Sequence, residues 1–361
     1  MCALEDNVKP GDTVLVNDWL IALTVTATTD TDVVCRVNAG GVLSDRKSMS
    51  FPNKVLKQTF LSEQDKSDLL FGIENDVDFV AASFVSRRQD LVDLNGFLRA
   101  HGGGDISVIA KIENQPGIDN IEDIFTECTG IMIARGDMGV EVPYEELPSI
   151  QKELIGKCRL LGKRVITATE MLESMTHNIR PTRAEISDVA NAIYDGTSAI
   201  MLSGETAAGA YPVEALKTMS AIAERTENEV HYRDNRLTDA AGQISVSDAT
   251  AHAACLTAKD VNASAIVTVS ESGNTARLLS KYRPSQPIIA CVMDEQVQRQ
   301  LSISWGITPL MMDLATSTDE LIEKSTTLAK EHGYLHDGEL AVVTAGVPVG
   351  VSGTTNTVSY T

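Results

Sequence analysis

Several features that would place this chain in other classes of protein are missing from its 361 residues. The six cysteines form no close pairs and are too sparse for a secreted disulfide scaffold, so we expect most of them to be buried thiols. No apolar run approaches the roughly 20 residues of a membrane span. The first residues also lack the basic and apolar regions of a secretory signal. These absences predict a protein of the reducing cytoplasm with no membrane partner.

Positive charge is scarce as well. The chain carries 30 Lys and Arg against 50 Asp and Glu, for a formal net charge of −20. This balance argues against a nucleic-acid partner or an anionic membrane, although it leaves room for a local cationic pocket around phosphates. The length is enough for two or three domains, and the hydrophobic content of 43% is that of a globular protein with a sizeable core. We therefore expect a small anionic partner.

The chain divides by pattern into three parts. Residues 1–52 are predicted to form a small antiparallel β module, because residues from about 11 to 52 alternate β-branched and polar positions, with turns predicted at Gly11 and at residues 38–41. From residue 53 to residue 235, apolar strands are separated by segments long enough for helices, which indicates βα units of a parallel sheet. These strands are predicted at 77–84, 106–113, 130–136, 164–168 and 199–203.

The polar motifs of this middle part follow the carboxyl ends of its strands. That arrangement is typical of a (β/α)8 TIM-type barrel, whose chemistry lies on this rim. Only five of the eight strands can be counted, so we expect a partial barrel with three strands missing on the N-terminal side. An open five-stranded array would expose strand edges, which predicts a marginal, oligomeric or aggregation-prone chain unless another segment completes it.

The third part, residues 236–361, has its own α/β pattern. It is predicted to be a doubly wound α/β domain, so the fold class of the whole chain is α/β. The pattern places a helix within residues 319–332 and strands at 264–270, 287–292, 307–312, 340–345 and 356–360.

Two neighbouring strands of the middle part deliver charged side chains to one edge. Lys111 and Glu113 lie two residues apart, so they share a face of one strand, and Asp137 follows the next strand. A cation and two carboxylates that meet in this way suit anionic, metal-bridged chemistry. Taken alone, the pair Lys111 and Glu113 is equally consistent with an ordinary salt bridge at a strand end.

The residues around these positions resemble the pyruvate kinase family, in that family's order and over essentially the whole chain. The resemblance is carried by KIEN (111–114), MIARGDMGVE (132–141), ATEMLESM (168–175), RPTRAE (180–185), DVANA (188–192), MLSGETA (201–207) and SGTTN (352–356). It implies transfer of a phosphoryl group from phosphoenolpyruvate to ADP, giving pyruvate and ATP. It also implies Mg²⁺ or Mn²⁺, K⁺, and a homotetramer with the segment around Arg183 and Glu185 near a subunit contact.

The resemblance also implies roles for single residues. Glu113 and Asp137 match the two carboxylates that hold the divalent ion, and Lys111 matches the lysine that contacts the transferring phosphoryl group. The backbone of Gly136 and Asp137 matches the part that holds the substrate carboxylate. Thr169 matches the threonine that contacts the substrate and helps to protonate the enolate.

Other matching positions depart from the family pattern or have no counterpart. The β module corresponds to part of the family's lid domain, and Lys47 matches a nucleotide-binding lysine in it. Residues 17–19 stand where the family has an Asp-Asp-Gly turn. Glu170 stands where the family commonly has glutamine. The family's N-terminal substrate arginine and asparagine and its K⁺ ligands have no counterpart here. The resemblance therefore implies little turnover from this polypeptide alone.

A serine-rich loop follows the first strand of the C-terminal domain. It precedes a predicted helix, so its hydroxyls and backbone N–H groups would converge at a helix N-terminus and could cradle a sugar phosphate. The family uses the equivalent loop for phosphorylated effectors. The matching positions are Ser270, Ser272, Gly273, Asn274 and Thr275.

Two other functions remain open at the level of sequence. One is a Mg²⁺-dependent C–C lyase of the related pyruvate-binding barrels, which pairs Glu and Asp around the metal to stabilise an enolate. The other is a catalytically silent remnant that binds a sugar phosphate or associates with full-length subunits.

Overall fold

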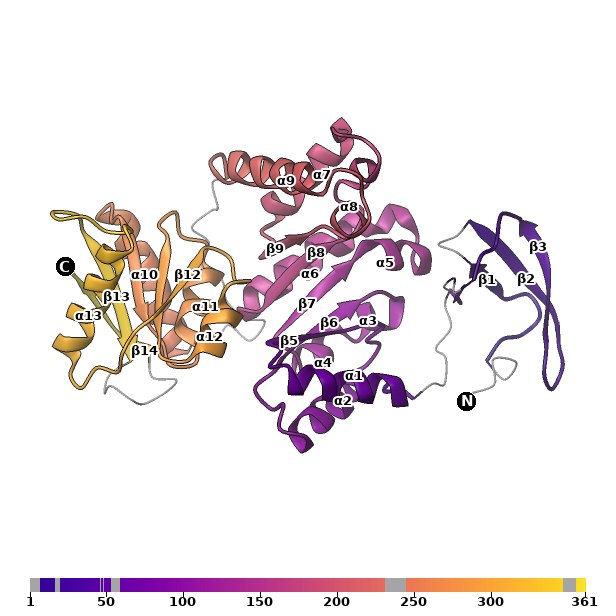
Figure 1. Ribbon diagram of the computed structural model, residues 1–361, viewed down its shortest axis with the longest axis horizontal. Helices are drawn as coiled ribbons and strands as arrows, with labels where there is room; N and C mark the ends of the chain where they lie inside the picture. The colour runs from indigo at the N-terminus through magenta and orange to yellow at the C-terminus, as the bar shows by residue number, and fades with distance from the viewer. Residues whose placement is uncertain are drawn as a thin grey trace. The chain divides into compact units, whose positions relative to one another are not determined.

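The computed structural model describes residues 7–16, 20–45, 47, 49–52, 59–230, 245–346 and 355–361 (Figure 1). The chain divides into two compact units: the first holds residues 1–154, 166–190 and 200–222, and the second holds residues 155–165, 191–199 and 223–361. The domain boundaries predicted after residues 52 and 235 fall beside or within undescribed residues and stay predictions. The segment 17–19 also lies outside the described residues.

The N-terminal β module is a four-stranded antiparallel sheet in the order β3-β2-β1-β4. Gly11 has a φ of +97°, and its N–H donates to Val25 O at 2.8 Å, so the predicted turn is present. The turn predicted at 38–41 is wrong for Asn38 and Ala39, which continue β3 because Ala39 pairs with Ala22 of β2. The strands are β1 (Thr13–Val16), β2 (Ile21–Thr28), β3 (Val33–Ala39) and β4 (Met49–Ser50).

The five middle strands predicted from the sequence form one sheet in the order β5-β6-β7-β8-β9, with β5, β6 and β7 paired in parallel. Among the described residues β5 and β9 are its edges, so the sheet is not closed into a barrel. The α/β fold and the partial barrel are confirmed. The strands are β5 (Phe79–Ala82), β6 (Ser107–Ile112), β7 (Gly130–Ala134), β8 (Arg164–Ala168) and β9 (Ala199–Met201).

One face of this sheet carries an apolar cluster that leads to the site. Ile109, Met132 and Ala168 are buried together on it. Because side chains alternate along a strand, Lys111 and Glu113 are expected on the face that holds Ile109, at the carboxyl end of β6. Helices connect the strands: α1 (Glu63–Glu74), α2 (Arg88–Ala100), α3 (Gln115–Asp119), α4 (Ile121–Phe125), α5 (Arg135–Glu141), α6 (Leu147–Leu161), α7 (Arg183–Asp195), α8 (Gly204–Ala207) and α9 (Pro212–Glu227).

The start of α7 is fixed by Glu185. Its carboxylate accepts hydrogen bonds from Thr182 N and Oγ1, and the Thr182 hydroxyl accepts from Glu185 N in return, which is a capping box. The same carboxylate accepts from Ser174 N and Oγ, at 2.7 and 2.6 Å. Burial pulls the pKa of Glu185 up, but these hydrogen bonds outweigh it and hold the pKa below its usual 4.5. The loop from Ser174 to Thr182 is therefore tied to one carboxylate.

Glu185→Gln is expected to lower the free energy of unfolding at pH 7 by about 1–3 kcal/mol, because the charge-assisted hydrogen bonds are lost. Since the folded pKa lies below 4.5, wild-type Glu185 contributes its full stabilisation above about pH 4.5 and loses it as the pH falls through the folded pKa. Urea titrations at several pH values should show the gap between wild type and variant closing in acid. Glu214→Gln, an exposed glutamate in the first turn of α9, is the control. Equal stability of the Glu185 variant at pH 7 would contradict the prediction.

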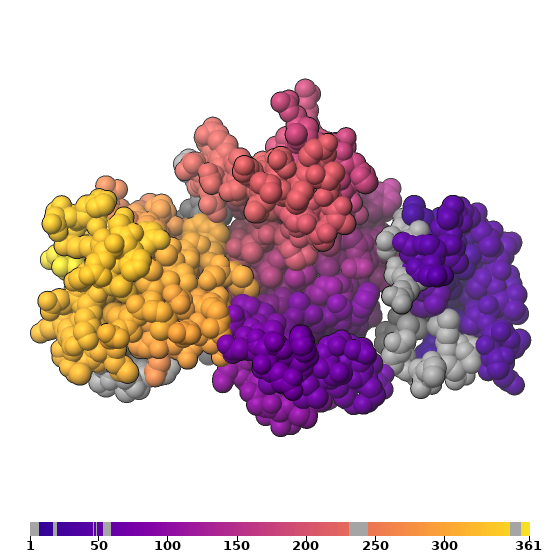
Figure 2. Space-filling model, viewed as in Figure 1, coloured from indigo at the N-terminus to yellow at the C-terminus, as the bar shows by residue number. Residues whose placement is uncertain are grey.

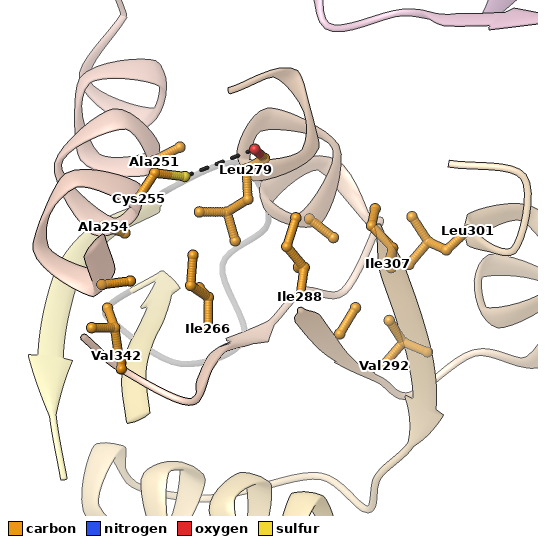
Figure 3. Packing of buried hydrophobic residues seen from close by; sticks show 14 residues of the cluster. Ala251, Ala254, Cys255, Ile266, Leu279, Ile288, Val292, Leu301, Ile307 and Val342 are labelled. Carbon is orange, nitrogen blue, oxygen red and sulfur yellow. Dashed lines mark hydrogen bonds between the residues drawn. The ribbon is translucent and has the colours of Figure 1, made fainter. Parts of the chain in front are cut away.

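The C-terminal strands form a second sheet in the order β12-β11-β10-β13-β14, parallel except for β13 and β14. Alternate residues of β10 face two separate cores: Ile266 packs with the residues of α10 and α11 shown in Figure 3, and Val267 packs on the opposite side with residues of α13. The doubly wound arrangement is therefore confirmed. The elements are α10 (Val246–Asp260), β10 (Ala265–Val269), α11 (Asn274–Lys281), β11 (Ile288–Val292), α12 (Glu295–Leu301), β12 (Ile307–Met311), α13 (Thr318–Glu331), β13 (Ala341–Gly346) and β14 (Thr355–Tyr360).

Four of the five described cysteines are buried, as expected for a chain without a disulfide scaffold. Burial raises the pKa of the Cys255 and Cys291 thiols to about 12, so they stay protonated. No helix of the described residues is both long and apolar enough to cross a membrane. Figure 2 shows α9 at the surface, where Val213 and Leu216 are more than half exposed.

Candidate active site

Lys111 and Glu113 meet at the carboxyl end of β6. Lys111 Nζ lies 2.7 Å from Glu113 Oε1 and donates to Ser83 Oγ at 2.8 Å. The exposed fraction of the side chain is 23% for the lysine and 1% for the glutamate. The ammonium group is thus reachable from solvent, while the carboxylate beside it is enclosed.

The second carboxylate lies within electrostatic reach. Burial raises the pKa of Glu113, and the charge of Asp137 raises it further, against the lowering effect of Lys111 and of the Phe84 N–H, which donates to Oε2. Oε1 is buried and accepts no bond of hydrogen-bond geometry, although Lys111 Nζ is at ion-pair distance from it. A metal ion at Oε1 would therefore share this oxygen with the Lys111 ammonium group.

This donor set fits a hard divalent ion. The described residues contain no group of three or more His, Cys, Asp or Glu side chains placed to enclose a metal. Mg²⁺ does not need such a cage, because it is usually held by one or two carboxylates together with water and substrate phosphates. Glu113 and Asp137 supply that number of carboxylates.

Thr169, directly after β8, contacts the backbone of Gly136. Its Oγ1 accepts from Gly136 N at 2.8 Å and donates to Ala168 O at 2.6 Å. A Cβ built on Gly136 would come 3.4 Å from that oxygen, which is an ordinary van der Waals contact. The structure thus brings together Gly136 and Thr169, two of the predicted substrate positions, and their binding role stays a prediction.

Arg135 is a site-forming residue that the sequence did not reveal. Thr169 and Glu170 have φ values of +66° and +54°, which are unfavourable for residues with a Cβ. Arg135 Nη2 donates to the carbonyl oxygens of both, at 2.8 and 3.2 Å, while Nη1 lies 2.7 Å from Asp188 Oδ2. The guanidinium group therefore fixes the turn that presents the Thr169 hydroxyl.

Arg135→Lys is expected to lower the free energy of unfolding by about 2 kcal/mol or more, because an ammonium group cannot bridge Asp188 and two carbonyls at once. Where turnover is measured, kcat should fall more than KM rises, since Thr169 is mispositioned and substrate anchoring is retained. Urea unfolding and steady-state kinetics check both. Arg88→Lys, an exposed ion pair with Glu127, is the control, and equal losses in the two variants would argue against the positioning role.

Comparison with known proteins decides the family. Two family models match: pyruvate kinase, barrel domain, over residues 1–216, and pyruvate kinase, alpha/beta domain, over residues 248–359. The chain belongs to the pyruvate kinase family.

Similar pyruvate kinases cover nearly the whole chain. That of Clostridium acetobutylicum is 49% identical over 355 residues, and that of Clostridium perfringens is 46% identical over 356 residues. In both cases the match covers 98% of this chain and 75% of the relative. The enzyme of Geobacillus stearothermophilus is 47% identical over 359 residues, which is 61% of its length. The pyruvate kinase resemblance and the phosphotransferase class predicted from the motifs are thus confirmed.

The serine-rich loop has only part of the predicted cradle. Gly273 is left-handed, with a φ of +73°, and precedes α11. Ser272 is exposed, but Ser270 is buried, and the buried Thr275 hydroxyl is hydrogen-bonded to that of Thr355. Asn274 begins α11. The effector role of this loop stays a prediction, with the exposed Ser272 as its most accessible hydroxyl.

Lys47 is exposed between residues that the structure does not describe, so its nucleotide role also stays a prediction. Two contacts of the site were missed in the sequence, those of Ser83 and Phe84. A signal for them existed: they lie at the end of the strand predicted at 77–84, on the same rim as Lys111.

Proposed function

We propose that this chain transfers a phosphoryl group from phosphoenolpyruvate to ADP, giving pyruvate and ATP. The observation that supports the proposal is the ion pair of Lys111 and Glu113 at the end of β6, within reach of the charge of Asp137, with Gly136 hydrogen-bonded to Thr169. This reaction gathers several negative charges, so catalysis depends mostly on alignment and charge neutralisation. A partly exposed ammonium group beside two carboxylates suits both.

Lys111 takes the role of the cation at the transferring phosphoryl group. Its Nζ is fixed by Glu113 and Ser83, so the charge is positioned before the substrate arrives. A preorganised cation stabilises the developing charge without reorganising in the transition state. The compact ammonium group acts as a point charge and needs no forked geometry.

Glu113 and Asp137 would hold Mg²⁺ or Mn²⁺, which when bound supplies charge neutralisation between the substrate and the protein. We extend to this chain the K⁺ requirement of the family. Gly136 and Asp137 N–H groups would hold the substrate carboxylate, which requires the Thr169 hydroxyl to turn away from Gly136 N. That hydroxyl is then placed to orient the proton for the enolate, through water, because a hydroxyl alone is a weak acid near neutral pH.

The test is a coupled assay of pyruvate formation from phosphoenolpyruvate and ADP. It is run on the chain alone and with an added N-terminal fragment taken from the Clostridium acetobutylicum enzyme. Turnover in either mixture supports the proposal. Retro-aldol cleavage without ATP formation would replace it with the lyase, and binding of sugar phosphates without either reaction would replace it with the silent remnant.

Assembly, location and regulation complete the proposal. Homotetramer formation is supported by the exposed Ile179 and Ile186, which flank the segment around Arg183 and Glu185. A cytoplasmic location and a place in glycolysis follow from the proposed reaction. The exposed part of the serine-rich loop is proposed to take a phosphorylated effector, and Lys47 a nucleotide.

A further inference from the structure

An exposed aromatic residue lies in the loop after β5, beside the candidate active site. Phe84 is 53% exposed, whereas the next residue, Val85, is fully buried. The Phe84 N–H donates to Glu113 Oε2, and the hydroxyl of the preceding Ser83 accepts from Lys111 Nζ at 2.8 Å. The loop therefore contacts both residues of the ion pair, and it leaves its larger apolar side chain exposed.

The backbone of Phe84 has an unfavourable conformation. Its φ is +55°, and a left-handed φ of a bulky residue persists only where the surrounding contacts fix it. Besides the bond to Glu113, the loop is held at Ser86. The side-chain N–H groups of Asn114 and Asn120 donate to Ser86 Oγ at 3.1 Å and to Ser86 O at 2.9 Å. These contacts fix the position from which the ring projects.

A glycine of α3 allows the loop to lie this close to its neighbour. A Cβ built on Gly117 would come 2.5 Å from Val85 O, so any side chain there would displace the backbone next to Phe84. Gly117 N in turn donates to Asn114 Oδ1 at 2.8 Å, which ties α3 to a residue that holds the loop. An unfavourable conformation that is fixed from several sides at a candidate site points to a function of the residue that has it.

The proposed substrate has one end that no group in the proposed mechanism contacts. Its phosphoryl group is assigned to Lys111, and its carboxylate to the N–H groups of Gly136 and Asp137. The end that is left is the methylene carbon of the enol, which is apolar. Small-molecule sites place apolar and aromatic side chains around such parts of a ligand. The inference that follows rests on the proposed function.

We propose that Phe84 is a specificity-determining residue, whose ring forms the apolar wall at the methylene carbon and limits the size of the group there. The adenine ring of ADP is a less favoured neighbour for Phe84. Two phosphates and a ribose separate that base from the transferring phosphoryl group, while the Phe84 loop contacts Lys111 and Glu113 directly. An added methyl group on the methylene carbon would meet the ring.

The experiment compares phosphoenolpyruvate with phosphoenol-2-oxobutyrate, which carries that added methyl group, by ATP formation in whichever mixture the wild-type chain turns over. Phe84→Gly removes the ring, keeps the N–H that donates to Glu113 and suits the left-handed φ, so the loop should be retained. We expect the ratio of kcat/KM for phosphoenolpyruvate to that for the homologue to fall about tenfold or more, since one methylene in an apolar pocket is worth about 10- to 200-fold. Phe84→Leu should give an intermediate ratio.

Phe71→Ala is the matched control. Phe71 belongs to the same unit and is 67% exposed on α1, so it is even more exposed than Phe84. Its replacement should leave the ratio unchanged. An unchanged ratio in folded Phe84→Gly and Phe84→Leu chains that still turn over phosphoenolpyruvate would overturn the inference. A raised KM for ADP with an unchanged ratio would also overturn it, because the ring would then contact the base.

Binding of the product tests the ring without turnover. Pyruvate carries the methyl group that forms from the methylene carbon, whereas oxalate has an oxygen in its place. Isothermal titrations in the presence of Mn²⁺ should show pyruvate binding weakened about fourfold in Phe84→Gly, as expected for one methyl group that loses its apolar neighbour, with oxalate binding unchanged. Equal weakening of both ligands would overturn the inference. A wild-type chain that neither turns over phosphoenolpyruvate nor binds pyruvate would instead refute the proposed function, and the inference with it.

Discussion

Lys111→Met is expected to lower kcat/KM for pyruvate formation by about a thousandfold, in whichever mixture the wild-type chain turns over. The size follows from losing a preorganised charge at the group being transferred, for which about a hundred- to a thousandfold is typical for one donor. Methionine keeps much of the length of the side chain, so the loss reports the charge and not a cavity. The ion pair to Glu113 and the bond to Ser83 are lost at the same time.

The control for this variant is Lys66→Met. Lys66 is a half-buried lysine of the same unit, ion-paired with Glu63 on α1, and neither residue is among the predicted site residues. Its replacement should leave kcat/KM within about twofold of wild type. Steady-state kinetics over a range of phosphoenolpyruvate concentrations give kcat and KM separately. A Lys111→Met chain that is folded and retains wild-type turnover would refute the role of the ammonium group.

The positions of the strands and of the charged trio could be predicted from the sequence for one physical reason. Parallel strands that are covered on both faces have continuous apolar sequences. The first polar residue after each apolar run therefore lies at the carboxyl edge of the sheet. Lys111 and Glu113 after Ile109 follow that rule, and so does Asp137 after β7. Local pattern was enough because each of these positions is set by its own strand.

Contacts that depend on distant segments could not be predicted in this way. The left-handed turn at Thr169 is held by Arg135, 34 residues earlier, and neither residue alone suggests it. The hydrogen bond from Arg164 Nε to Ser304 Oγ joins residues that are 140 positions apart. Asn38 and Ala39 resemble a turn locally but are kept extended by pairing with β2. In each case tertiary contacts override the local preference.

Glu113→Gln is expected to weaken Mn²⁺ binding by about ten- to a hundredfold or more. Even changes in residues that only support metal ligands cost this much, and here one of two proposed carboxylate ligands is replaced by a neutral amide of the same shape. The amide oxygen can still accept from the Phe84 N–H, so the loop after β5 should keep its conformation. Mn²⁺ affinity is measured by electron paramagnetic resonance of the free ion, with no requirement for turnover.

Glu205→Gln is the matched control for Glu113→Gln. Glu205 is also a fully buried carboxylate of the same unit, and it accepts from the backbone N–H groups of Leu172 and Ser203. Its replacement should leave Mn²⁺ affinity near that of wild type. A folded Glu113→Gln chain that binds Mn²⁺ as tightly as wild type would contradict the proposed metal site, and equal weakening in both variants would indicate a general effect of losing a buried carboxylate.

Mn²⁺ binding by the Lys111→Met variant shows whether Lys111 and Glu113 belong to a metal site or only form a salt bridge at the end of β6. Lys111 Nζ lies 2.7 Å from Oε1, the oxygen that a metal would need, so the ammonium group repels an incoming divalent ion. Removing it should leave Mn²⁺ affinity unchanged or raise it, while turnover falls. If the pair were only structural, neither variant would change the affinity. Weaker metal binding in Glu113→Gln but not in Lys111→Met, with loss of turnover in both, is expected only where the lysine faces the phosphoryl group and the glutamate faces the metal.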